Sequence, residues 1–262
     1  MGGDAVIIDL RGNGGGNSDA ANLFSKSFLA PDPDPARATL PASRARDPHW
    51  IGKPTYLLVD GGDASAAEAV AYGAQQENTA TIVGSTTYGG ANNNRKFPIA
   101  PQFVLSVSYN RPVNPISGTN WEGVGVKPDI DVEGEQALEA AELDALGRLS
   151  RTTGLSSQRL AEYRWAGVGI NARLHPVTVD PMRLRPLAGV YGTVELKMSP
   201  EGLRFYRADR PKRPQGVVMT PLDDSGLFEV PGYADLRLRV TGPDLVLMHG
   251  AEDAQESFKR SR

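Results

Sequence analysis

Hydrophobic positions in the first half of the chain follow two periods that alternate along the sequence. Short apolar runs of strand length are followed by segments with helical spacing. Strands are predicted at residues 5–10, 54–59, 81–84 and 103–109, and helices at 19–29 and 66–76, the first of them with one apolar face. Residues 31–53 are predicted to form a long surface loop, and residues 88–94 a polar glycine loop. Strands that alternate with helices indicate a mostly parallel sheet, so this half is predicted to have an α/β fold.

The second half has a different pattern. Residues 136–147 and 156–166 have helical composition and are predicted to form a helical linker. From Leu187 onward, short alternating runs are separated by turn residues, which is typical of a small antiparallel β domain. We therefore predict three parts: a core at residues 1–134, the linker at 135–175 and a β-rich domain at 176–262.

Composition excludes several classes of function. The 262 residues are 40% apolar and 23% charged, with a net charge of -3, as in an ordinary globular protein. The chain has no run of basic residues, so nothing in its charge pattern indicates a nucleic-acid partner. The absence of cysteine excludes disulfides and thiolate metal sites. No apolar run reaches the roughly 18 residues of a transmembrane segment. The first residues do not resemble a signal peptide, so an extracytoplasmic location would require a longer native form.

Ser65 lies where the strand at 54–59 turns through Gly61-Gly62 into the helix at 66–76. The first N–H groups of a helix lack internal partners, and together with the helix dipole they stabilise negative charge. That position favours a nucleophile whose reaction forms an oxyanion. The alternative is that Ser65 or Asp63 caps the helix, and caps are much commoner. This stretch alone therefore favours the cap.

The strand that begins at Ala5 is predicted to be buried and ends in a second candidate site, the glycine-rich loop at residues 12–16. Its glycines allow a tight turn that brings backbone N–H groups close to a ligand. A phosphate loop would need a Gly-Lys-Ser/Thr ending, which is absent. The dinucleotide fingerprint fails because Asn17 occupies its last glycine position. An oxyanion-hole loop fits the sequence better.

Four motifs follow one another along the first half of the chain: D-L-R-G-N-G-G-G at 9–16, S-A-A-E at 65–68, V-G-S-T-T-Y-G-G-A at 83–91 and W-E-G-V-G-V-K-P-D-I at 121–130. In this order they resemble the catalytic core of the S41 peptidases, which include tail-specific and tricorn-type serine proteases. The modules of interphotoreceptor retinoid-binding protein share this core. The resemblance covers about residues 4–133 and implies a ClpP/crotonase-like α/β fold.

The resemblance also implies roles for single residues. Ser65 corresponds to the nucleophile, and the N–H groups of Ala66 and Gly15 to the oxyanion hole. Apart from the resemblance, three glycines are expected to let a bound peptide backbone approach closely; they are Gly14, Gly89 and Gly90. The alternative for Gly89 and Gly90 is that they only permit a turn.

The general base is expected to be a histidine. Gly90 stands where the tail-specific branch has its catalytic lysine, which disfavours a lysine–serine pair. The tricorn-like branch uses a histidine oriented through a glutamate, and Glu122 matches that glutamate. In that branch the histidine precedes the D-L-R-G strand, and none of the three histidines in the chain lies there; they are His49, His175 and His249.

This gap leaves three interpretations of the chain. It is a fragment, it has a misassigned start, or it is a true short form that binds without cleaving. The first two are favoured, because a first buried strand rarely begins so close to an initiator methionine.

The expected function is a serine-type peptidase that attacks an extended peptide or protein substrate and needs no metal or organic cofactor. One alternative is a non-catalytic module of the same fold that binds a peptide or a lipid. Another is a crotonase-type acyl-CoA enzyme, which the S-x-x-E and W-E-G motifs argue against.

Overall fold

The structure is a computed structural model that describes residues 3–29, 53–207, 216–233, 235–241, 243–251 and 254–261. The surface loop predicted at residues 31–53 lies outside the described residues except for Lys53, and His49 lies within the part that is not described. The chain divides into two units, Met1–Ala145 and Leu146–Arg262. The division falls inside helix α3 (Ala137–Leu149), so the three-part division of the chain stays a prediction.

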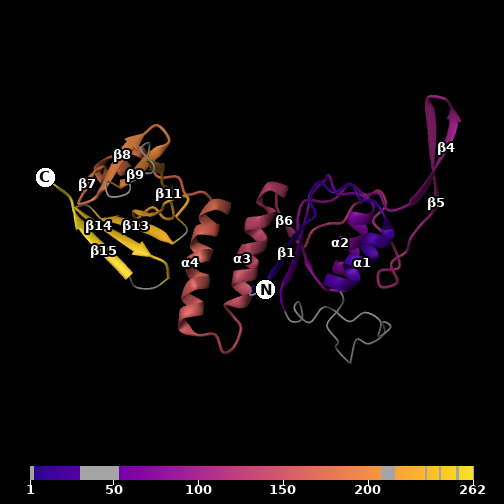
Figure 1. Cartoon of the computed structure of the whole chain (residues 1–262), viewed down its shortest axis with the longest axis horizontal. Helices are drawn as coiled ribbons and strands as arrows, with labels where there is room; N and C mark the ends of the chain where they lie inside the picture. The colour runs from indigo at the N-terminus through magenta and orange to yellow at the C-terminus, as the bar shows by residue number, and fades with distance from the viewer. Residues whose placement is uncertain are drawn as a thin grey trace. The chain divides into compact units, whose positions relative to one another are not determined.

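A four-stranded parallel sheet forms the centre of the first unit (Figure 1). Its order is β1-β2-β3-β6, with bounds Val6–Asp9, Thr55–Val59, Thr81–Gly84 and Ile130–Asp131. Strand β2 is buried along its whole length, as expected for an apolar run between two neighbours. Strand β1, predicted to be buried, is only half-buried because it pairs with β2 alone and forms an edge. The prediction of a parallel α/β sheet is confirmed.

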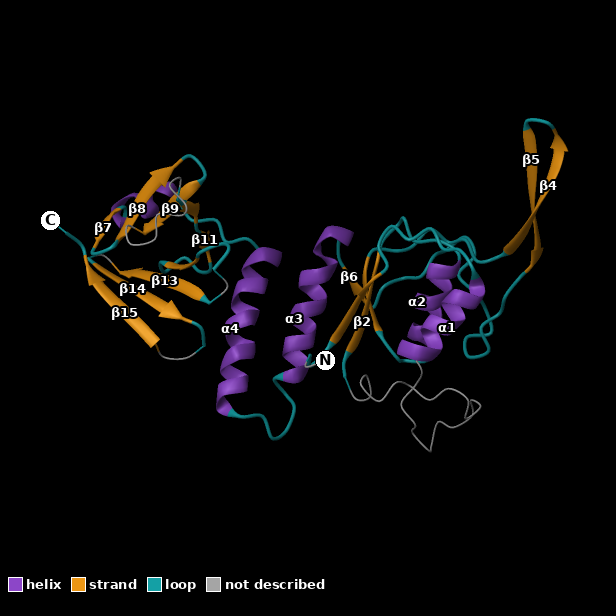
Figure 2. Ribbon diagram, viewed as in Figure 1, coloured by secondary structure: helices purple, strands orange, loops and turns teal. Residues whose placement is uncertain are grey.

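Helices cover both faces of this sheet (Figure 2). Helices α1 (Ser18–Phe28) and α2 (Ala66–Gln76) lie on one face, and α3 lies on the other. The Tyr56 hydroxyl of β2 donates to Asp144 of α3 at 2.8 Å. The apolar face predicted for α1 is only partly correct, because Leu23 is 67% exposed.

A two-stranded antiparallel hairpin projects from the first unit, formed by β4 (Asn93–Ala100) and β5 (Phe103–Asn110) (Figure 1). Strand β5 was predicted, but residues 92–94 were predicted to be part of a loop. That prediction is wrong from Asn93 onward, because the strand continues through polar residues that face solvent on a projecting hairpin.

The second unit begins with α4 (Ser157–Leu174), which extends well beyond the predicted end at residue 166. Two short helices follow, α5 (Pro181–Leu184) and η3 (Arg185–Leu187). Within the described residues, nine strands then form two antiparallel sheets, which confirms the antiparallel β structure predicted from Leu187 onward (Figure 2). The first sheet contains β7 (Gly189–Tyr191), β8 (Val194–Ser199), β9 (Gly202–Arg207) and β10 (Val217–Val218). The second contains β11 (Thr220–Pro221), β12 (Leu227–Glu229), β13 (Leu236–Thr241), β14 (Asp244–His249) and β15 (Ala254–Lys259).

The cores of the two units are separate clusters of buried side chains. In the first unit, residues of β2, β3 and α2 pack together with Trp121. In the second, apolar residues of both sheets pack between them. None of the helices in the described part of the chain is long and apolar enough to span a bilayer.

Candidate active site

The backbone of Ser65 distinguishes it from the other helix-capping residues. Asn17 and Ser156 precede α1 and α4 in extended conformations, and each side chain accepts a hydrogen bond from the first turn. Ser65 precedes α2 with φ 55° and ψ −114°. A positive φ at a non-glycine residue costs on the order of 1–3 kcal/mol and persists only where the surroundings enforce it. The geometry of Ser65, which is exposed, is therefore not that of an ordinary cap.

Glu68 holds this conformation from the third position of α2. Its carboxylate is fully buried and accepts four hydrogen bonds. Oε2 accepts from the N–H groups of Ser65 and Gly90, both at 2.8 Å. Oε1 accepts from the Thr87 hydroxyl and the Gly89 N–H, both at 2.6 Å. Each lone pair thus has a donor, which offsets the cost of burying the charge. The S-A-A-E motif places Glu68 three residues after Ser65, but the sequence did not predict the contacts of this carboxylate with the loop at 87–90.

Glu122 continues the same pattern one step along that loop. The N–H groups of Ala91 and Asn92 donate to Glu122 Oε2 at 2.7 and 2.8 Å. Four consecutive backbone N–H groups, those of residues 89–92, therefore donate to two carboxylates. Among the described residues, no hydrogen bond ends on Oε1 of Glu122, which is exposed. The role predicted for Glu122, orienting a histidine, stays a prediction.

Gly15 lies directly against the Ser65–Ala66 peptide. A Cβ at Gly15 would lie 2.5 Å from Ala64 O, 2.7 Å from Ala66 N and 2.8 Å from Ser65 Cβ, and the φ of Gly15 is +87°. Only glycine fits there. The two residues predicted to form the oxyanion hole are thus neighbours in space.

The two N–H groups differ in their present partners. The Gly15 N–H donates to the Asn13 side chain at 3.0 Å. The Ala66 N–H has no acceptor among the residues that the structure describes, as expected at the start of a helix. Gly14 lies in the same loop and has open space around it.

Two aspartates that the sequence did not single out as site residues brace the glycine-rich loop. Asp63 is 1% exposed and accepts from the N–H groups of Asn13 and Asp60, both at 2.9 Å. Asp60 in turn accepts from the Gly12 N–H at 3.0 Å. Burial raises the pKa of the Asp63 carboxyl to about 6, although its two N–H donors act in the opposite direction. Asp63 was considered as a helix cap; its carboxylate instead joins the two loops.

Gly89 and Gly90 occupy different environments. Gly89 has φ +93°, and a Cβ there would lie 3.0–3.3 Å from the backbone of residues 123–125. Its N–H donates to Glu68 and its carbonyl accepts from Gly123, so the close packing of two loops explains this glycine. At Gly90 a Cβ would meet the Tyr88 ring at 3.4 Å and Glu68 Oε2 at 3.7 Å. The predicted contact of both glycines with substrate stays a prediction.

A cavity of about 440 Å³ opens beside Gly15 and Ala66, between β1, α1 and α2. Its walls are mostly apolar or small side chains, including Ile8, Leu10, Phe24, Ala67 and Val70. Such a cavity suits an apolar side chain of a ligand that is held at the Ser65 turn.

The described residues of the first unit, 3–29 and 53–145, contain no histidine. His175 ends α4, and His249 in β14 contacts Glu256 at 3.0 Å; both belong to the second unit. No histidine is thus brought to Ser65 within the described part of the first unit.

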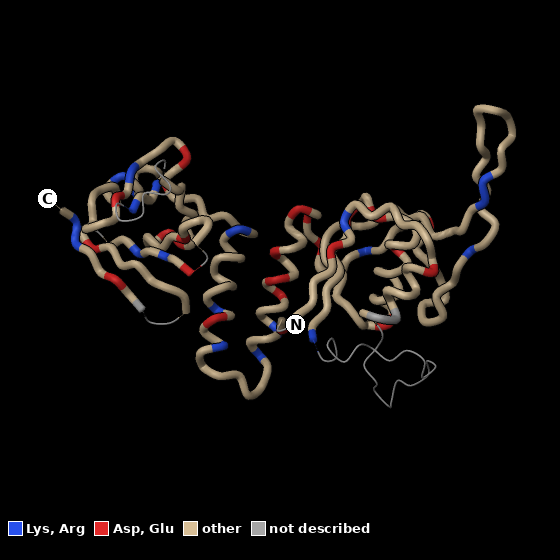
Figure 3. The backbone as a smooth tube through the Cα atoms, in the orientation of Figure 1, with Lys and Arg blue, Asp and Glu red and all other residues tan. Residues whose placement is uncertain are grey.

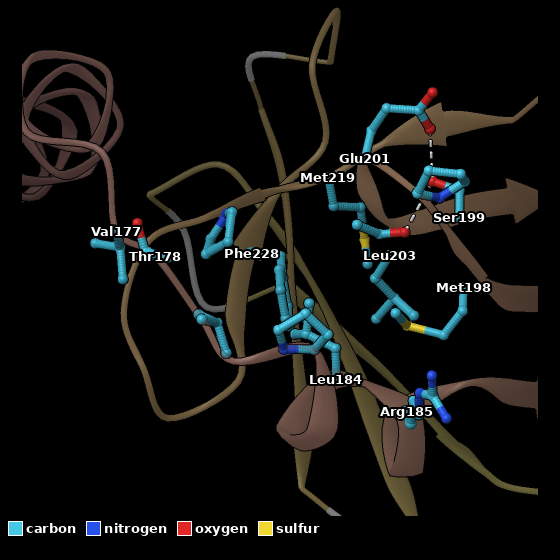
Figure 4. Close-up of a pocket in the computed structure, with 15 residues that line it drawn as sticks. Val177, Thr178, Leu184, Arg185, Met198, Ser199, Glu201, Leu203, Met219 and Phe228 are labelled. Atoms are coloured by element: carbon cyan, nitrogen blue, oxygen red, sulfur yellow. Dashed lines mark hydrogen bonds between the residues drawn. The ribbon is translucent and has the colours of Figure 1, made fainter.

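A larger cavity, about 770 Å³, lies in the second unit and is mostly apolar (Figure 4). Leu184, Leu203 and Phe228 form part of its wall, and Arg185 lies at its edge. The Ser199 hydroxyl contacts Glu201 at 2.8 Å and the Gly202 carbonyl at 3.0 Å. None of the S41-like motifs contributes to this cavity.

Comparison with known proteins shows the family. The family model of peptidase family S41 matches residues 2–132, which is half of the chain. The chain belongs to peptidase family S41.

Two curated relatives match the same region of this S41 chain. A carboxy-terminal-processing protease of Bartonella bacilliformis is 30% identical over 139 residues, which cover 48% of this chain and 30% of the relative. The carboxy-terminal processing protease CtpA of Bacillus subtilis is 31% identical over 93 residues, covering 34% of this chain and 20% of the relative. The chain thus matches less than a third of the length of either relative. Among solved structures, a photosystem II D1 C-terminal processing protease has 25% identity and a TM-score of 0.40, with 51% of this chain and 36% of that chain covered.

Proposed function

We propose that the first unit is the serine-bearing part of a serine-type peptidase with a ClpP/crotonase-like core. The observation that carries this proposal is the backbone of Ser65, held at φ 55° where α2 begins, with Gly15 against it. Strain of this kind concentrates at functional sites, and an ordinary cap does not need it.

In the proposed reaction, Ser65 Oγ attacks the carbonyl of a peptide bound in extended form. The N–H of Ala66 donates to the oxyanion that forms. The Gly15 N–H becomes the second donor once it leaves Asn13, a rearrangement that substrate binding would drive. An apolar side chain of the peptide would occupy the 440 Å³ cavity.

The proton of Ser65 needs a base within hydrogen-bond reach. We propose that a histidine from outside the described residues takes it and that Glu122 Oε1 orients that histidine. The β-rich domain proposed at residues 176–262 would position the substrate or stabilise the core, with the helical linker at 135–175 between the two.

The test is peptide cleavage by the protein isolated or expressed in its native length. Ser65→Ala should lower kcat/KM by at least about a thousandfold while leaving folding unchanged. Ser18→Ala, at the exposed start of α1, is the matched control and should keep the wild-type rate. Cleavage by Ser65→Ala at the wild-type rate would end the proposal.

A second candidate is a binding module of the same fold. The observation that favours it is the absence of a histidine from the described residues of the first unit. Tight binding of a peptide or lipid, without peptide cleavage and without reaction of Ser65 with a serine-directed probe, would select it.

A further inference from the structure

The β4–β5 hairpin exposes an unusual amount of apolar surface. Every residue of both strands is exposed. The large apolar side chains on it are 41–64% exposed; they are Phe97, Ile99, Phe103, Val104, Leu105, Val107 and Tyr109. Contiguous apolar surface of this kind marks a place of interaction.

The strand register shows how this surface is distributed. Near the base of the hairpin, Lys96 pairs with Ser106, which makes one face polar. Near the tip, Phe97 pairs with Leu105 on one face and Pro98 with Val104 on the other, so both faces are apolar. A protein packed on one face would leave the other face of the tip in water. The boundary of a lipid bilayer would surround it.

Charge on the hairpin has one sign. Arg95, Lys96 and Arg111 lie towards its base, and residues 93–121 contain no aspartate or glutamate. In Figure 3 the tip is free of charge and the cations lie below it. Two such hairpins packed together would place cations near cations without an acid between them. An anionic lipid surface complements them.

The dimensions and the base of the hairpin agree with this partner. Arg95 and Ile99 are four residues apart, about 13 Å along a strand. Cations at headgroup level would thus place the tip roughly 10 Å deeper, the depth of interfacial insertion. The Arg95 guanidinium lies 4.8 Å from the centre of the Tyr109 ring, and tyrosine and arginine are both typical of this interface.

The backbone of the tip is also suited to a site with little water. Pro98 and Pro101 carry no N–H, which removes two donors that would otherwise need partners. Proline within a strand is also typical of edge strands that do not pair with another chain, and β4 carries one at Pro98.

We infer that the β4–β5 hairpin docks on anionic membranes by inserting its apolar tip, residues 97–105, at the headgroup boundary. The test is co-sedimentation of the native-length protein with vesicles of phosphatidylcholine alone or mixed with phosphatidylglycerol. The wild type should bind the mixed vesicles, and added salt should weaken this binding.

Two sets of variants separate the contribution of the apolar tip to vesicle binding from the contribution of the cations. Ile99→Asp with Phe103→Asp should abolish vesicle binding. Arg95→Gln and Lys96→Gln should each weaken it roughly fivefold at low salt. Met182→Asp is the matched control, because Met182 is 67% exposed in the second unit, and it should bind as the wild type does. Circular dichroism and melting verify that each variant is folded.

A separate readout does not depend on the aspartate variants. A single Phe103→Trp variant should show a blue shift and quenching by brominated lipid when mixed vesicles are added. Absence of wild-type binding, or equal binding by the folded tip variant, would overturn the inference. If the wild type does not bind vesicles but forms a dimer, and Ile99→Asp dissociates that dimer, the inference is overturned and the partner of the hairpin is a second copy of the chain.

Discussion

The backbone conformation of Ser65 depends on two neighbouring carboxylates, those of Glu68 and Asp63. Glu68 Oε2 accepts from Ser65 N–H and from Gly90 N–H, so one oxygen joins the nucleophile turn to the loop at 87–90. Asp63 joins the same turn to the glycine-rich loop through Asn13. Two buried carboxylates thus fix the positions of both loops relative to Ser65.

Glu68→Gln tests the first of these connections. The new amide group would face two of the four donors, because an NH₂ group cannot accept. The free energy of unfolding of the Glu68→Gln variant, measured in urea, should therefore be about 2–4 kcal/mol lower than that of the wild type. Glu135→Gln, at an exposed position, should change it by no more than about 0.5 kcal/mol. Equal stability of the two variants would contradict the role given to Glu68.

Asp63 should make stability depend on pH. Its pKa is about 6 in the folded protein against an ordinary value of 3.8, so between these values the folded state binds more protons than the unfolded state. Stability from this group therefore falls as pH rises from about 4 to about 6, by roughly 3 kcal/mol in total.

The measurement is the difference in unfolding free energy between the wild type and Asp63→Asn across this pH range. The difference should shift against the wild type as pH rises. A flat difference, or one that shifts in favour of the wild type, would show that the two N–H donors outweigh burial.

At the scale of elements, the contact between the β1–α1 loop and the start of α2 builds the site. Gly15→Ala should destabilise the protein by about 2 kcal/mol or more, since the methyl group would overlap the backbone of Ala64 and Ala66 at a positive φ. Gly14→Ala meets no atom within 4 Å and should be close to neutral. Urea unfolding of the pair measures this, and similar values for the two variants would refute the contact.

Local pattern was sufficient to predict the elements around Ser65. The helix predicted at 66–76 and the strands predicted at 54–59 and 81–84 correspond to α2, β2 and β3. The apolar runs form strands of a buried sheet, and the Ala-rich segment forms a helix that covers this sheet, so burial and intrinsic propensity favour the same elements. Strand β4 was missed because its first residues are asparagines, which favour turns, and its pairing with β5 is what makes it a strand.

The candidate site was predictable only in part. Motif order indicated Ser65, Ala66 and Gly15, which the structure places together. The bracing roles of Glu68 and Asp63 were not predicted, because each depends on partners far away in the sequence, which no local pattern encodes. The Gly89 and Gly90 N–H groups lie 21 and 22 residues from Glu68, and the Asn13 N–H lies 50 residues from Asp63.

For the whole molecule, two units have separate cores, and all the S41-like motifs lie in the first. The family match ends at residue 132, before α3 begins. The β-rich unit has its own packing and its own cavity, whereas the proposed nucleophile and both proposed oxyanion-hole donors lie in the first unit.

The most direct test of this account is whether Ser65 reacts as a nucleophile. The native-length protein would be incubated with a fluorophosphonate probe, and its intact mass and labelled peptide determined. The account predicts a single adduct on Ser65 that is lost in Ser65→Ala and retained in Ser18→Ala. A folded protein that forms no adduct, or forms it on another serine, would contradict the assignment of Ser65 as the nucleophile.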